Sequence, residues 1–343
     1  MESSQPSEPV QNVVEEPGQA GDHEVIESLL LALSAPDWHV AQAAAAALAE
    51  LGETAAVQPL IAALASEDRH ISQAAATALG ELADARAVQP LLLALSAPNW
   101  HVRQSAAGAL GRIGDPRAID PLVAALLARD AEVRHAAIEA LDSTGWAPRN
   151  ARERAACSIA NDEWSTCVEI GAPAVEPLVT ILGVGGAGVR EAAAAALGRI
   201  GDPSAIDPLV AALVDYYPNV REASATALGR IGDPRAVEPL VAALRGRYPE
   251  VLQAAAAALG VIGGPAVEPL IAVFDDPGSR AEERVWAAQS LVDIYQSGRL
   301  GEAERLDILR RRQQIERTHY DAQGGAYCAS RSRHADQGVV FVD

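Results

Sequence analysis

Apolar residues recur along the chain in paired segments whose spacing fits amphipathic helices. The longer segment of each pair follows the pattern V-R-x-x-A-A-x-A-L-G-x-I, with apolar positions three and four residues apart. Most copies end at a glycine, the residue best suited to the left-handed position after a helix. These glycines are Gly52, Gly114, Gly145, Gly201, Gly232 and Gly263. Ala83 takes that place in the second copy and predicts a poorer helix end.

The shorter segment of each pair begins with an aspartate and a proline in three copies, at Asp115-Pro116, Asp202-Pro203 and Asp233-Pro234. An aspartate N-cap followed by proline is typical of a helix start. A later proline, such as Pro121, falls inside the same segment and predicts a kink, because proline removes a backbone donor. A second set of caps is predicted to open the longer helices, at Asp37, Asp68, Asn99 and Asp130.

The paired segments form a tandem repeat, marked by the proline of a (V/I)-x-P-L signature. These prolines are Pro59, Pro90, Pro121, Pro177, Pro208, Pro239 and Pro269, separated by 31, 31, 56, 31, 31 and 30 residues. A degenerate first copy around Ser28 brings the total to about eight repeats of ~31 residues. A unit this short must stack on its neighbours to bury its apolar face. We therefore predict an all-α, right-handed α-solenoid of helix pairs, with glycines at one recurring helix position where neighbouring repeats approach closely. These are Gly80, Gly111, Gly198, Gly229 and Gly260.

The strings GDPRAVEPLVAAL and VREASATALGRIG resemble the short bacterial HEAT-like repeat named after the phycobilisome lyases, over about residues 24–298. The resemblance is specific for fold, but proteins with this repeat include scaffolds, bilin lyases and hydroxylases. The predicted organisation is a disordered acidic tail (1–22), HEAT-like repeats one to four (23–145), a helical insertion (146–170), repeats five to eight (171–298), a capping helix (299–319) and a loosely ordered tail (320–343).

Composition and charge exclude several classes of partner. The formal net charge of -19 argues against nucleic acid and anionic lipid, both of which need a basic surface. No segment approaches the ~18 apolar residues of a membrane span, and the first residues do not form a signal peptide. We expect a cytoplasmic monomer. Cys157, Cys167 and Cys328 are read as reduced thiols.

The search for catalytic and metal-ligating residues favours a protein without a cofactor. His39, His70 and His101 recur at one site, but successive repeats ~10 Å apart cannot share one metal ion. Hydroxylases that resemble this repeat, of the deoxyhypusine hydroxylase type, carry several His-Glu pairs binding two irons, whereas only His23-Glu24 is present here. That enzyme class is therefore rejected. A tetrapyrrole (bilin) lyase or chaperone remains the alternative function, although no pigment pocket is evident.

A protein–protein interaction scaffold or adaptor is the preferred function. Its partner is expected along the concave face of the second helices or along their turn edge, where exposed aromatic and arginine side chains would be binding hot spots. The predicted contact residues are Trp38, His39, Arg69, His70, Gln73, Trp100, His101, Gln104, Arg112, His135, Tyr217 and Tyr248. An alternative interpretation of the rings is that each covers the turn of an adjacent repeat. The recurring arginine of the pattern, as at Arg190 and Arg221, is read as a structural ladder.

Overall fold

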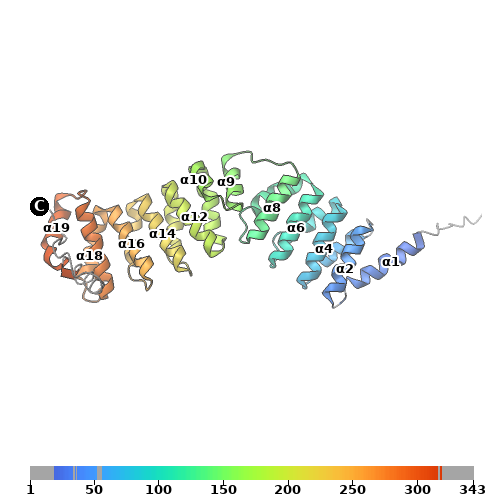
Figure 1. The fold of residues 1–343 in the computed structure, drawn as a ribbon, viewed down its shortest axis with the longest axis horizontal. Coiled ribbons are helices and arrows are strands. Elements are labelled where there is room, and N and C mark those ends of the chain that lie inside the picture. The colour runs from blue at the N-terminus through green and yellow to red at the C-terminus, as the bar shows by residue number, and fades with distance from the viewer. Residues whose placement is uncertain (1–18, 34, 36, 52–55, 316, 319–343) are drawn as a thin grey trace, which may run out of the picture. The chain divides into compact units, whose positions relative to one another are not determined.

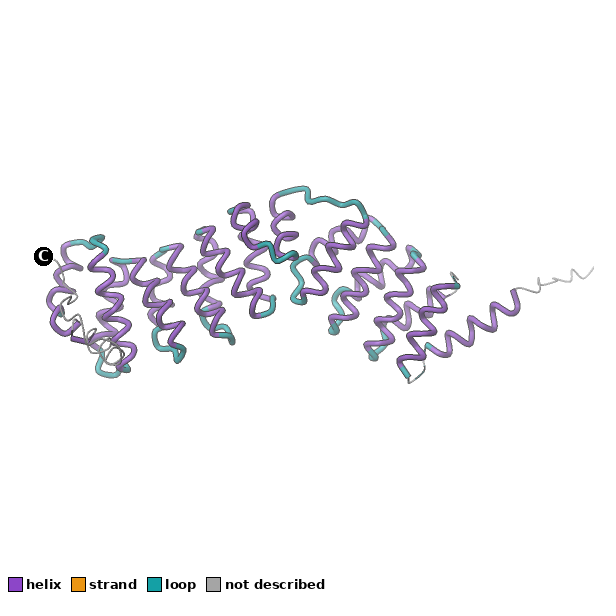
Figure 2. Tube along the Cα trace, viewed as in Figure 1, coloured by secondary structure: helices purple, strands orange, loops and turns teal. Residues whose placement is uncertain are grey.

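A computed structural model describes residues 19–33, 35, 37–51, 56–315 and 317–318, and these residues form helices joined by turns (Figure 2). They confirm the all-α solenoid prediction, with helix pairs in the predicted order. The predictions for residues 1–18 and 320–343 lie outside the described residues. Helix α1 begins at Gln19, somewhat before the predicted start of the first repeat.

The chain forms two compact units. The first holds the described residues up to Ala125 together with Ala136–Ala147, and the second holds Leu126–His135 and the described residues from Pro148 onward. The first unit contains α1 (Gln19–Ala32), α2 (Trp38–Glu50), α3 (Val57–Leu64), α4 (Arg69–Leu82), α5 (Val88–Ala94), α6 (Trp100–Ile113) and α7 (Ile119–Ala125), and α8 (Ala131–Ser143) belongs partly to each unit.

From α11 to α18 the second unit repeats the alternation of shorter and longer helices, after the two short helices α9 and α10 (Figure 1). It contains α9 (Ala151–Ala160), α10 (Trp164–Ile170), α11 (Val175–Val184), α12 (Ala187–Ile200), α13 (Ile206–Ala212), α14 (Pro218–Ile231), α15 (Val237–Ala243), α16 (Pro249–Ile262), α17 (Val267–Asp275), α18 (Ala281–Gln296) and α19 (Glu302–Arg310). The predicted insertion thus holds two short helices, α9 and α10. Trp164 packs against the core of this unit.

In the three repeats that contain it, the Asp-Pro motif starts the shorter helix through a 3-10 turn. Asp115 accepts a hydrogen bond from the backbone N–H of Arg117 at 2.8 Å, and a 3-10 turn over Pro116–Ala118 precedes α7. Pro121 is consequently the third residue of α7. A proline in the first helical turn removes no α-helical hydrogen bond that the turn would otherwise make, so this position accommodates it, and the kink stays a prediction.

The longer helices stack on one another to build each core. Within the first unit α2 packs on α4 and α4 on α6, and in the second unit α12, α14, α16 and α18 pack in succession. Small residues allow the close approach that the glycine pattern predicted. A Cβ added at Gly111 would lie 2.5 Å from the Cα of Ala140, and one at Gly198 would lie 2.6 Å from the Cα of Ala227.

Candidate functional site

The first three longer helices carry the predicted aromatic turn residues at their N-termini. Trp38, Arg69 and Trp100 are the first residues of α2, α4 and α6. The cap before each of them, Asp37, Asp68 or Asn99, accepts a hydrogen bond from the backbone N–H of the following histidine at 2.8–2.9 Å. These caps place a large side chain and a histidine at the same point in each of the three repeats.

The rings at this edge stack both within and between repeats. The ring centroid of Trp38 lies 3.5 Å from that of His39 and 4.5 Å from that of His70 in the next repeat. Trp100 stacks on His101 at 3.5 Å. Arg69 donates from Nε to Nε2 of His70 at 3.3 Å. Trp38 is half-buried, so it both contributes to packing between repeats one and two and remains accessible to a partner.

A surface groove of about 520 Å³ lies between α2 and α4. It brings together three of the predicted contact residues, Trp38, His70 and Gln73. Its remaining lining comes from the same two helices and is small or polar: Gln42, Ala46, Ala74, Thr77, Ala78 and Glu81. The rings stand at the N-terminal end of these helices and Glu81 near the C-terminal end of α4. We call this hollow the α2/α4 groove.

The other predicted contacts on the longer helices lie outside the α2/α4 groove. Gln104 is half-buried on α6, Arg112 is exposed near the C-terminus of α6, and His135 is exposed on α8. Trp100 and His101 form a separate pair at the start of α6. The structure thus gathers only part of the predicted set into one surface hollow.

Tyr217 and Tyr248 take part in a ladder with the arginines of the preceding repeat. The Cζ atom of Arg190 lies 5.6 Å from the ring centroid of Tyr217, and that of Arg221 lies 4.5 Å from the ring centroid of Tyr248. Each tyrosine is the N-cap residue of the next longer helix. Both rings therefore cover an adjacent repeat, as the packing interpretation proposed, while they remain about half exposed.

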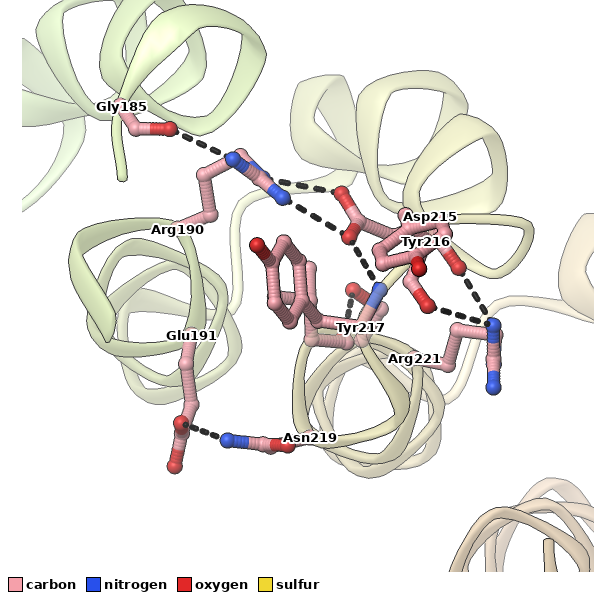
Figure 3. Close-up of polar contacts among 10 residues, drawn as sticks. Gly185, Arg190, Glu191, Asp215, Tyr216, Tyr217, Asn219 and Arg221 are labelled. Carbon is pink, nitrogen blue, oxygen red and sulfur yellow. Dashed lines mark hydrogen bonds and ion pairs between the residues drawn. The ribbon is translucent and has the colours of Figure 1, made fainter. Parts of the chain in front are cut away.

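The arginines of the ladder also cap the shorter helices (Figure 3). Arg190 donates to the carbonyl of Gly185 and forms an ion pair with Asp215 at 2.8 Å, while Arg221 donates to the carbonyl of Asp215. Burial raises the pKa of Asp215, but the hydrogen bonds from Arg190 and from the backbone N–H of Tyr217 lower it by more, so its carboxyl group is held ionised. The predicted structural role of this arginine row is confirmed.

Arg134 occupies the same row in the fourth repeat and is fully buried. Its Nη1 donates to the carbonyls of Ala128 and Arg129, and its Nη2 lies 3.7 Å from Asp162 in the insertion. Burial lowers the pKa of the Arg134 guanidinium. The insertion is thereby joined to the repeat array by a structural contact.

Sequence reasoning missed a second hollow, of about 420 Å³, at the turn edge of the sixth and seventh repeats. Arg245 and Arg247 line it from the turn before α16. A signal was present in the sequence, because this turn reads R-G-R-Y where the equivalent turn of the sixth repeat reads V-D-Y-Y. We call this hollow the arginine pocket.

The metal and membrane predictions can be compared with the described residues only. Within them, no three His, Cys, Asp or Glu side chains converge as ligands for a metal ion. The side chain of His23 lies outside the description. Across the helices that are described, none combines the length and the apolar character needed to cross a membrane.

The stacked helix pairs define this chain as an all-α solenoid protein. A family model described as HEAT repeats matches residues 3–73, 57–142, 175–260 and 206–292, more than half of the chain. The chain belongs to the HEAT repeat family, as the resemblance implied. No curated protein sequence matches it significantly.

Several solved structures are similar in fold. Human deoxyhypusine hydroxylase in complex with glycerol is 23% identical, with 71% of this chain and 98% of that chain covered and a TM-score of 0.34. Importin beta is 17% identical, with 81% and 47% covered and a TM-score of 0.33, so the match spans about half of that chain. The complex of CpcE and CpcF of phycocyanin lyase from Nostoc sp. PCC7120 is 21% identical, with 91% and 100% covered and a TM-score of 0.29. These TM-scores are too low to indicate a function for this chain.

Proposed function

We propose that this protein is a non-catalytic interaction scaffold or adaptor that holds a protein partner along the exposed side and turn edge of its longer helices. HEAT repeats are typically protein-interaction scaffolds. The observation that carries the proposal is the α2/α4 groove, where Trp38, His70 and Gln73 line one surface hollow. A cytoplasmic location and a monomeric state remain part of the proposal.

The α2/α4 groove has the features of a protein contact surface. A half-buried tryptophan offers a large rigid area at low entropic cost, and aromatic residues are enriched among binding hot spots. Glu81 and the glutamines supply polar contacts around it. Removing the Trp38 ring should cost binding more than folding, because the side chain is only half-buried.

The test compares two double variants in capture of partners from an extract of the native host, with bound proteins identified by mass spectrometry. Trp38→Ala/His70→Ala removes the rings of the groove, and Trp100→Ala/His101→Ala removes an equivalent stacked pair outside it. We expect the first variant to capture at least tenfold less of the proteins that the wild type binds. The second variant should capture the same amount as the wild type. Equal capture by all three proteins would refute the groove as the contact surface, and equal loss in both variants would place the contact along the whole edge.

A further inference from the structure

We propose that the arginine pocket binds an acidic segment of a protein partner that also carries an aliphatic side chain. The proposal rests on the proposed scaffold function and assigns it a second surface with a defined chemistry. The pocket lies wholly within the second unit, between the end of α13 and the turn before α16.

The first step is the charge of the lining. Arg221, Arg245 and Arg247 line the arginine pocket, and no acidic residue does. The whole chain, in contrast, has 46 acidic and 27 basic residues. On so acidic a chain these arginines form a local basic surface, and arginine suits carboxylates because its planar donors match them.

The second step is that two of these charges, those of Arg245 and Arg247, are available to a ligand. Arg245 and Arg247 are exposed, and within the described residues neither forms an ion pair. Arg221 donates from its Nη1 to the carbonyls of Asp215 and Tyr216, while its Nη2 is buried and has no hydrogen-bond partner in the described part of the chain (Figure 3). Arg245 and Arg247 therefore supply the accessible positive charge of the pocket, and Arg221 adds to it from a buried position.

The third step is that the turn is fixed before any ligand binds. Arg280 of the next repeat donates from Nη2 to the carbonyl of Gly246 at 2.6 Å and is itself held by the buried Glu283. The ring of Tyr248 is held over Arg221. The backbone that carries Arg245 and Arg247 is thus supported from both sides, which reduces the entropy lost on binding.

The fourth step is the apolar component of the ligand. Val214 lines the arginine pocket and is 85% exposed, although it is aliphatic. Tyr216, beside it in the chain, is also 85% exposed. Aliphatic surface next to the arginines favours a peptide with aliphatic side chains, and the net charge of -19 opposes a nucleic acid because it is a long polyanion.

The test is a fluorescence-anisotropy titration of the full chain with a labelled peptide of alternating Glu-Leu and Asp-Val pairs. The comparison probes are its Lys-Leu and Arg-Val counterpart and a single-stranded DNA of mixed sequence. We expect the acidic peptide to bind in a salt-sensitive manner. Arg245→Ala/Arg247→Ala should weaken it at least tenfold, whereas Arg199→Ala/Arg230→Ala, an equal charge change on exposed residues outside the pocket, should weaken it less than twofold. Arg245→Glu/Arg247→Glu should bind the basic peptide more tightly than the wild type does.

Three results would overturn the proposal. They are no binding of the acidic peptide up to about 1 mM, equal weakening by the two alanine pairs, and tighter binding of the DNA than of the acidic peptide. Circular dichroism of each variant confirms that it is folded. Because Trp38 and His70 lie outside the pocket, Trp38→Ala/His70→Ala should leave the peptide affinity unchanged. A negative result for the arginine pocket would therefore leave the proposal for the α2/α4 groove untouched.

Discussion

Two glycines of helix α6 give opposite predictions for the same substitution. A Cβ added at Gly108 meets nothing within 4 Å, whereas one at Gly111 would lie 2.5 Å from the Cα and 2.6 Å from the Cβ of Ala140. Alanine within a helix is favoured over glycine by about 1 kcal/mol. Gly108→Ala should therefore raise the free energy of local unfolding by about 0.5–1 kcal/mol.

Gly111→Ala combines the same helix preference with a steric cost. Overpacking a core costs about 1–3 kcal/mol, and here the obstructing atom is backbone, which cannot rotate away. The hydrogen bond from the Ser143 hydroxyl to the carbonyl of Gly111, at 3.0 Å, would also be stretched as the helices separate. We expect a net loss of about 1–2 kcal/mol, which is roughly a 5- to 30-fold increase in the open population.

Hydrogen–deuterium exchange of peptides from α6 is the appropriate assay, because repeat arrays need not unfold in two states. Exchange in Gly108→Ala should be slower than in the wild type, and exchange in Gly111→Ala faster. Slower exchange in both variants would show that helix preference alone controls this position, and the close-approach reasoning would then be wrong.

Four further predictions follow from single contacts or from the repeat itself. Ala83 has φ +50° at the end of α4, where other repeats have glycine, so Ala83→Gly should raise the melting temperature, with an expected gain of about 1 kcal/mol; an unchanged or lower value would contradict this. A hydrogen bond from the Arg117 side chain lowers the pKa of Asp115 from 3.8 to about 2. The stability that this carboxylate contributes is therefore present above about pH 4 and is lost as the pH falls toward 2. Carboxyl NMR titration should show a higher Asp115 pKa in Arg117→Gln, and an unchanged pKa would refute the assignment. Burial raises the pKa of the Cys167 thiol from 9.0 to about 11, so mass spectrometry after iodoacetamide treatment at pH 8 should find it unmodified in the folded protein and modified in urea. Deleting residues 202–232 should leave a cooperatively melting helical protein by circular dichroism, because it removes one whole repeat, and a complete loss of folding would contradict the solenoid.

The repeat register made much of the fold predictable from sequence. Caps such as Asp68 and helix ends such as Gly114 are local, so a few residues determine them. The position of Pro121 within its helix was less predictable, because the 3-10 turn before α7 moves the start of the α-helix to Ile119.

The candidate surfaces were less predictable, because they depend on side-chain directions across repeats. The contact of Trp38 with His70 needs the relative rotation of α2 and α4, which spacing does not supply. The Arg190–Tyr217 and Arg221–Tyr248 pairs did leave a signal, since each spans 27 residues (217 − 190 and 248 − 221). Recognising it required knowing that these two positions face each other.

The ladder between repeats has an evolutionary consequence. The segment 202–232 contains Tyr217, which receives Arg190, and Arg221, which reaches Tyr248. It likewise contains Ala227, which fits against Gly198, and Gly229, which accommodates Ala258. A duplicated copy of this segment would thus carry both halves of every such contact and could stack on its parent without any new mutation. Tandem gene duplication could lengthen this protein, and unequal recombination shorten it, one whole repeat at a time.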